Sequence, residues 1–117
     1  MASPLAERRC EKCAPGTPPI DPKEVPELLA QLDPGWTVEE QEGHQVLVRR
    51  FRFKGFMPAV DFVNRLAPVA EAEGHHPDLL VGWGYVTVQL WTHAAGGLTA
   101  NDFILAAKVD LAESPKS

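Results

Sequence analysis

The chain has 117 residues, a length that fits one domain with a modest hydrophobic core. Its formal net charge of -5 argues against a nucleic-acid-binding surface, because affinity for nucleic acid comes mostly from Lys and Arg side chains that displace counterions. No apolar run approaches the roughly 20 residues of a bilayer span, and the first residues lack the apolar core of a secretory signal. The sequence therefore predicts a cytoplasmic protein with no membrane partner and no direct nucleic-acid partner.

Residues 1–20 are rich in proline, a composition that resists regular structure. They predict a flexible N-terminal segment before a single domain over residues 21–117. The segment holds both cysteines, Cys10 and Cys13, in one Cys-x-x-Cys motif. A zinc site usually takes four ligands, and a thioredoxin-like motif lies between a strand and a helix, so neither context is met. We interpret the pair as reduced thiols; a four-thiolate zinc shared by two subunits is the alternative.

Residues 21–32 are predicted to form the first helix. Asp21 can cap this helix, Pro22 suits its first position, and apolar residues recur on one face. Pro26 leaves open a start one turn later, and the Pro-Gly pair at 34–35 ends the helix in either case.

Residues 36–55 predict a β-hairpin that turns within the sequence EEQEGH, because β-branched and aromatic residues flank that turn. His44 falls in the turn, and we expect it to be solvated. The alternation of apolar and polar residues slips at Arg49 and Arg50, a pattern that a β-bulge would explain.

Residues 58–73 carry apolar side chains at the spacing of a helix with one buried stripe, and Pro68 should kink this helix. Residues 79–93 predict a second hairpin that turns at residues 84–85, since glycine tolerates a positive φ. Alternate residues of a strand share a face. His93 therefore lies at the end of the second strand, on its more polar face.

The last helix is predicted over residues 96–112, with Thr99 as N-cap and Asp102 three residues later, in the manner of a capping box. Asp102 can cap the helix and face a pocket at once. The order helix, hairpin, helix, hairpin, helix predicts an α+β fold, in which an antiparallel β-sheet has helices packed on one face as a two-layer sandwich. A homodimer or homotetramer would cover the exposed face and edges of such a sheet.

Two adjacent histidines, His75 and His76, precede Pro77, and imidazole is the side chain best suited to carry protons near neutral pH. Pro77 biases His76 toward extended backbone, so the two rings should point in opposite directions and should not chelate one metal ion. Glu71 lies one helical turn before His75, close enough to orient a ring. With His93 these residues indicate a site, but their spacing alone leaves ordinary surface or core histidines equally open.

The series Glu71-x-x-x-His75-His76-Pro77, with Trp83, His93 and Asp102 after it, resembles the signature of the pterin-4a-carbinolamine dehydratase family. Eukaryotic members of that family include the dimerisation cofactor of a homeodomain transcription factor. The resemblance covers residues 21–113, and the N-terminal Cys-x-x-Cys is similar to that of many bacterial relatives. Further matching segments are Gly35-Trp36, residues 97–99 and residues 101–106.

The resemblance implies dehydration of 4a-hydroxytetrahydropterin, the carbinolamine that aromatic amino-acid hydroxylases release. The products are quinonoid dihydropterin and water, in tetrahydrobiopterin recycling. The resemblance also implies a metal-independent hydro-lyase without a cofactor, in which histidines act as general acids and bases. A non-catalytic dimerisation or protein-binding module of the same family is the alternative function, and a redox or zinc protein built on the two cysteines is a third.

The resemblance also implies roles for individual residues. His75 and His93 are expected to exchange protons near the C4a hydroxyl, one on each face of the ring, while His76 binds and orients the substrate. Asp102 is expected to hold His93 or its loop. The expected catalytic residues are His75, His76 and His93. The expected substrate-binding residues, with no metal ligand among them, are Glu71, His75, His76, Pro77, Thr92, His93, Ala94, Ala95 and Asp102.

Three other positions qualify this assignment. Some relatives carry an arginine where this chain has Asn101, which puts any cationic contribution to substrate binding in doubt. Pro68 lies in the helix that carries Glu71, and a distortion there would shift that carboxylate. We expect Trp83 to pack within the protein.

Overall fold

The computed structural model describes residues 4–11 and 16–113 of the chain. Within these ranges the strands are β1 (Thr37–Gln41), β2 (His44–Arg52), β3 (Asp78–Gly82) and β4 (Tyr85–Leu90). The α-helices are α1 (Val25–Leu29), α2 (Phe56–Glu73) and α3 (Ala100–Glu113). Short 3₁₀ helices are η1 (Pro4–Glu7), η2 (Pro22–Glu24) and η3 (His93–Ala95).

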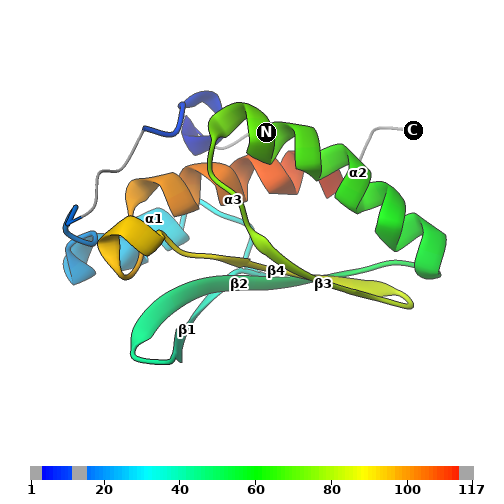
Figure 1. The fold of residues 1–117 in the computed structure, drawn as a ribbon, viewed down its shortest axis with the longest axis horizontal. Helices are drawn as coiled ribbons and strands as arrows, with labels where there is room; N and C mark the ends of the chain where they lie inside the picture. The colour runs from blue at the N-terminus through cyan, green and yellow to red at the C-terminus, as the bar shows by residue number, and fades with distance from the viewer. Residues whose placement is uncertain (1–3, 12–15, 114–117) are drawn as a thin grey trace.

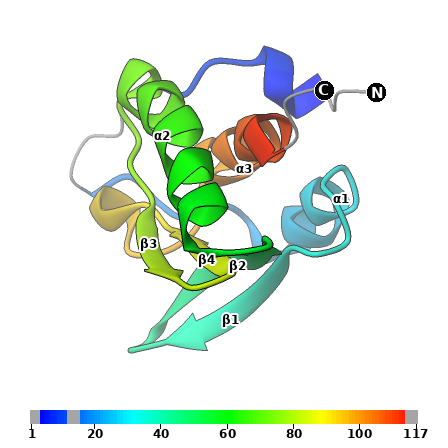
Figure 2. The same ribbon diagram turned by 90° about the vertical axis from the view of Figure 1, so that its right-hand side faces the viewer.

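The four strands form one antiparallel sheet in the order β1-β2-β4-β3. Helices α2 and α3 pack against each other and lie on the same side of this sheet (Figure 1; Figure 2). The predicted α+β fold, with helices on one face of an antiparallel sheet, is confirmed. The homodimer or homotetramer that would cover the other face stays a prediction. In the described ranges, none of the helices has the length and apolar character needed to cross a membrane.

The hydrophobic core lies between the sheet and the two long helices. Val86, Val88 and Leu90 of β4 are fully buried on the inner face, as their period-two spacing predicts. Helix α2 contributes the predicted stripe, and its buried members are Ala59, Phe62, Leu66 and Ala70. The core therefore follows from the periodicity of the sequence.

The inner face of β2 includes a charged residue. The pairing of β2 with β4 continues without interruption from Leu47 opposite Leu90 to Arg52 opposite Tyr85, so the β-bulge expected at Arg49-Arg50 is wrong. In this register Arg49 shares the inner face with Leu47 and Phe51. The apparent slip in the pattern is an inward-facing arginine in a regular strand.

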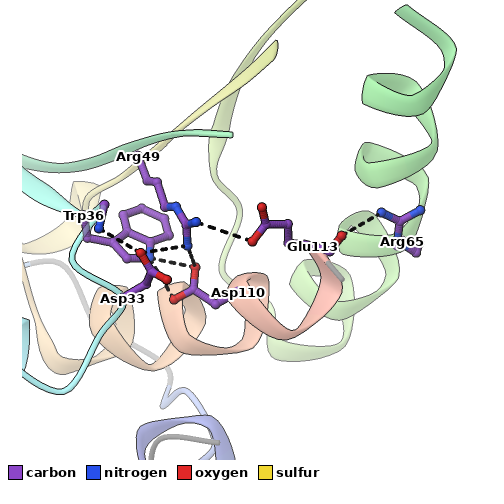
Figure 3. Close-up of polar contacts among 7 residues, drawn as sticks. Asp33, Trp36, Arg49, Arg65, Asp110 and Glu113 are labelled. Atoms are coloured by element: carbon purple, nitrogen blue, oxygen red, sulfur yellow. Dashed lines mark hydrogen bonds and ion pairs between the residues drawn. The ribbon is translucent and has the colours of Figure 1, made fainter. Parts of the chain in front are cut away.

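The guanidinium of Arg49 is neutralised by carboxylates of α3 and of the loop before β1 (Figure 3). Its Nη1 lies 2.6 Å from Asp110 Oδ1 and 3.6 Å from Asp33 Oδ1, and its Nη2 lies 3.4 Å from Glu113 Oε1. Trp36 Nε1 donates to the same Asp110 carboxylate at 2.9 Å. Burial raises the pKa of Asp110, although the hydrogen bond from Trp36 and the charge of Arg49 act to lower it. This cluster links β2, α3 and the loop before β1.

Arg65 of α2 holds the C-terminal end of α3 (Figure 3). Its side chain donates to the carbonyl of Ala112 at 2.8 Å and to that of Glu113 at 3.2 Å. These carbonyls lack partners within the helix, and a cation also complements the negative end of the helix dipole. The two long helices are thus joined by polar contacts as well as by the core.

Prolines set the start of one helix and are tolerated inside another. The Asp21 side chain accepts from the backbone N–H of Lys23, as expected of a cap, but the turn that follows is the 3₁₀ helix η2. The α-helix begins only at Val25, next to Pro26, which matches the later of the two predicted starts. Helix α2 runs through Pro68 and ends at Gly74, which has a φ of 66°.

The second hairpin turns at Trp83-Gly84, one residue earlier than predicted. Gly84 supplies the positive φ, 82°, that the turn requires. The side chain of Trp83 is 75% exposed at this turn, so its expected packing role is wrong.

The N-terminal segment packs against helix α3. In place of the irregular lead-in expected from composition, Pro4–Glu7 form η1, and Leu5 is buried in the main core. Lys108 Nζ donates to the carbonyl of Ala6 at 2.8 Å. The isolated Leu5 gives no periodic signal in a proline-rich stretch, which is why the sequence does not predict this contact.

Candidate active site

A pocket of about 740 Å³ lies where the end of α2, the start of β3 and the segment after β4 meet. Six of the nine predicted substrate-binding residues line it: His75, His76, Pro77, Thr92, His93 and Ala94. The other three predicted residues, Glu71, Ala95 and Asp102, are not on its wall. The three histidines singled out in the sequence therefore border one hollow.

The end of α2 places the two adjacent histidines. Gly74 adopts a left-handed conformation that stops the helix, and the backbone N–H of His75 still donates to the carbonyl of Ala70. The side chains then diverge, as expected. His75 is 12% exposed and contacts Asp102, whereas His76 is 61% exposed and contacts Glu71. Glu71 thus orients His76, not the His75 ring one turn away.

Asp102 is fully buried in the first turn of α3 and is the centre of a hydrogen-bond network. Its Oδ1 lies 2.6 Å from His75 Nε2. Its Oδ2 accepts from the Thr92 hydroxyl and from the backbone N–H of Thr99, both at 2.9 Å. Asp102 was expected to hold His93 or its loop; it holds that loop through Thr92, but its histidine partner is His75.

The predicted capping box is only half formed. Asp102 accepts the backbone N–H of Thr99, as the box requires. The Thr99 hydroxyl instead contacts the Thr92 hydroxyl at 2.8 Å. Since the Thr92 proton is directed to Asp102, the Thr99 hydroxyl is the donor in that pair. The threonines thus fix the carboxylate against His75.

The arrangement determines which nitrogen of His75 is available for chemistry. Asp102 accepts two other hydrogen bonds and acts as a pure acceptor, so Nε2 of His75 is the protonated nitrogen of the neutral ring. Nδ1 then accepts a proton in the neutral ring and donates one in the charged ring. His75 can serve as a base or an acid through this atom.

His93 is held by aromatic stacking. His93 begins η3, after β4 has ended. The centroid of its ring lies 3.8 Å from the centroid of the Trp91 ring, at an interplanar angle of 27°. The His44 ring lies 3.7 Å from Trp91 at 21°. Two rings at such distances must lie on opposite faces of the indole. His44 is therefore half-buried in a three-ring stack, and its predicted solvation is wrong.

The comparison with known proteins gives the family. Residues 18–112 match the family model described as pterin 4 alpha carbinolamine dehydratase. The chain belongs to the pterin-4-alpha-carbinolamine dehydratase family. A relative from Rickettsia canadensis, named "Putative pterin-4-alpha-carbinolamine dehydratase", is 47% identical over 106 residues, 91% of this chain and 94% of the relative. A similarly named protein from Gloeobacter violaceus is 48% identical over 106 residues, 91% and 90% of the two chains.

Solved structures agree with this membership in the dehydratase family. A crystal structure described as a transcriptional coactivator/pterin dehydratase from Brucella melitensis has a TM-score of 0.73 at 32% identity, covering 82% of this chain and 99% of that one. A pterin dehydratase-like protein, described as a RuBisCO assembly factor in the alpha-carboxysome, has a TM-score of 0.57 at 25% identity, with coverages of 70% and 93%.

The pocket of this dehydratase family member also has a wall that sequence analysis missed. Arg9, Cys10 and Glu11 line it from the N-terminal segment, together with Glu73, Trp91 and Asn101. The proline content of residues 1–20 pointed away from any structured contribution. Two of these residues did carry a signal: the alternation of the second predicted hairpin puts Trp91 on the face of His93, and the family resemblance marked Asn101 as a position that bears on substrate binding.

Cys10 is held as a neutral thiol. Burial, together with the nearby charges of Glu73 and Asp102, raises its pKa from 9.0 to about 12. Cys13 lies outside the described residues, so the reduced state of the pair stays a prediction. Within the described ranges, no three His, Cys, Asp or Glu side chains are grouped so as to hold a metal ion.

Alkylation measures this environment. In a Cys13→Ser variant, Cys10 should react with iodoacetamide at pH 8 about 1,000-fold more slowly in the native protein than in urea, because only the thiolate reacts. The rate is followed by mass spectrometry. Equal rates in the two states would mean that the N-terminal segment is not docked.

Proposed function

We propose that the chain dehydrates 4a-hydroxytetrahydropterin to quinonoid dihydropterin and water by histidine general acid–base catalysis, as a step of tetrahydrobiopterin recycling. The observation that supports this most directly is the gathering of His75, His76 and His93 around one pocket in a member of the dehydratase family. The proposed reaction uses no metal ion, nucleotide or covalent intermediate.

The reaction needs two proton transfers. The C4a–O bond breaks, and the hydroxyl leaves as water only if an acid protonates it. The pterin ring nitrogen next to C4a loses a proton to a base, and the electron pair of that N–H bond forms the C=N double bond. Positioned acids and bases typically contribute about 10²- to 10⁴-fold each, which suits a substrate that already dehydrates slowly on its own.

We assign the base to His75 and the acid to His93. His75 accepts the proton at Nδ1, while Asp102 holds Nε2–H and stabilises the imidazolium that forms. His93 in its charged form donates to the leaving hydroxyl, and the face of Trp91 favours that cation. His76, exposed and paired with Glu71, binds and orients the substrate at the edge of the pocket. The pterin ring also meets backbone groups of Thr92, Ala94 and Pro77, which help to shape the pocket.

The test is a stopped-flow dehydration assay on freshly generated carbinolamine. His75→Ala and His93→Ala should each lower kcat by about 10²- to 10⁴-fold, and His76→Ala should mainly raise KM. The matched control is His44→Phe, which removes an imidazole outside the pocket and keeps the ring stack on Trp91. It should retain the wild-type kcat/KM. Wild-type rates in all three pocket variants would refute the assignment.

A binding module is the second candidate. The carboxysome neighbour is described as an assembly factor, and in this chain Trp83 and Leu80 expose large apolar side chains, 75% and 55% accessible, on the β3–β4 hairpin. Side chains of this kind are typical of protein interfaces. A folded wild-type protein that does not accelerate dehydration at all would favour this candidate.

A further inference from the structure

The N-terminal segment is fixed to the body of the domain at both ends of its pocket-lining part. At one end Leu5 is 2% exposed in the core, and Lys108 donates to the carbonyl of Ala6. At the other end the Asn101 side-chain amide forms two hydrogen bonds with the main chain of Glu11. Its Oδ1 accepts from the Glu11 N–H at 2.9 Å, and its Nδ2 donates to the Glu11 carbonyl. A two-way bond of this kind fixes the backbone as a neighbouring strand would.

Glu73 fixes the middle of this segment. Its side chain is 7% exposed, accepts the backbone N–H of Cys10 at 2.8 Å and pairs with Arg9 Nε at 3.0 Å and Lys108 Nζ at 3.6 Å. Although burial acts to raise the pKa of Glu73, the Cys10 N–H and the two cations hold it below its usual value. Two of the fixing residues adjoin the catalytic network, since Glu73 precedes Gly74-His75 and Asn101 precedes Asp102.

We propose that Arg9 and Glu11 are substrate-binding residues, so that the N-terminal segment forms one wall of the pterin site. This inference rests on the function proposed above. Both residues line the same pocket as the three histidines. Arg9 provides N–H donors and Glu11 carboxylate acceptors, which match the polar edge of a pterin ring and its hydroxylated substituent. Neither residue belongs to the network that holds His75, so they act in binding and not in proton transfer.

The test compares Arg9→Ala and Glu11→Ala with two matched controls, Arg8→Ala and Glu7→Ala. The controls remove the same charges from neighbouring exposed positions that do not line the pocket. The test variants keep the backbone bonds of Cys10 and Glu11, and Glu73 keeps Lys108, so the segment stays docked. Three quantities are measured: the KM and the kcat of dehydration, and the Kd of biopterin, an unreactive pterin, by calorimetry.

Each test variant should raise both KM and the biopterin Kd by about 3- to 10-fold, the loss of one hydrogen bond, with kcat unchanged. The controls should keep wild-type values. Unchanged KM and Kd in both test variants would overturn the inference. The proposed function is tested separately, by the histidine variants. An equal rise in the controls would also overturn it, since the effect would be one of net charge. A wild-type protein that neither binds biopterin nor dehydrates carbinolamine would overturn both proposals.

Discussion

Replacing Asp102 with asparagine is expected to lower kcat for carbinolamine dehydration by about 10²- to 10⁴-fold. Oδ2 of Asp102 faces two donors, Thr92 and the N–H of Thr99. The asparagine must therefore place its carbonyl oxygen there and turn its NH₂ group toward His75. A donor facing Nε2 moves the ring proton to Nδ1, the atom assigned as the base. The shape of the side chain is almost unchanged, so the loss comes from the tautomer.

The imidazole ¹⁵N spectrum separates this effect from a loss of structure. In the wild type Nε2 of His75 should carry the proton, and in Asp102→Asn Nδ1 should carry it. Urea unfolding of the same samples checks that the variant is folded. A wild-type kcat, or a proton that stays on Nε2 while kcat falls, would contradict the role given to Asp102.

Replacing Arg49 with alanine is expected to cost about 3 kcal/mol of unfolding free energy, measured by urea denaturation at pH 8. Arg49 is 13% exposed and provides the cation for Asp110, which is 18% exposed. Without it, the Asp110 carboxylate keeps only the Trp36 N–H among its partners described above. Breaking one side of a buried pair leaves a charge that the interior does not solvate, which costs more than the pair contributed. The figure is at the lower end of the usual range because both groups keep some exposure.

The neighbouring residue provides the control. Arg50 lies on the opposite face of β2, where its side chain is exposed and donates to Thr87, so Arg50→Ala should cost less than about 1 kcal/mol. The pH dependence gives a second check. Burial already raises the pKa of Asp110, and removal of Arg49 raises it further, so protonation favours the folded variant. The difference in unfolding free energy between wild type and Arg49→Ala should therefore be smaller at pH 4 than at pH 8. A difference that grows with acid would contradict this account.

The fold was predictable because its elements are strongly periodic, and the errors occur where one side chain departs from the pattern. The helix stripe around Phe62 and the alternation around Val88 gave correct elements. Arg49 interrupts the apparent alternation of β2 because a charged residue in a strand is usually taken to face solvent. Here it faces the core, where Asp110 of α3, 61 residues later in the chain, neutralises it. A pattern within one strand carries no information about that partner.

The candidate site was predictable in its residue types but not in its pairings. The adjacent histidines and the two carboxylates were found from local order and family resemblance. Which carboxylate serves which ring depends on where α2 stops: Gly74 turns the chain so that His75 faces Asp102 and His76 faces Glu71. The N-terminal wall was missed because its contacts are specific hydrogen bonds, such as those of Asn101 with Glu11, which leave no periodic trace.

The contact between Lys108 and Ala6 joins residues 102 positions apart, and Leu5 is buried beside it. During synthesis on the ribosome, the segment that carries Leu5 emerges long before α3, so its apolar side chain has no surface to cover it while the hairpins form. The β-sheet can assemble first, and the wall of the pocket can be added only when α3 has emerged. Cys10 of a ribosome-bound chain that ends before α3 should therefore stay open to alkylation, and it should become protected once α3 has emerged.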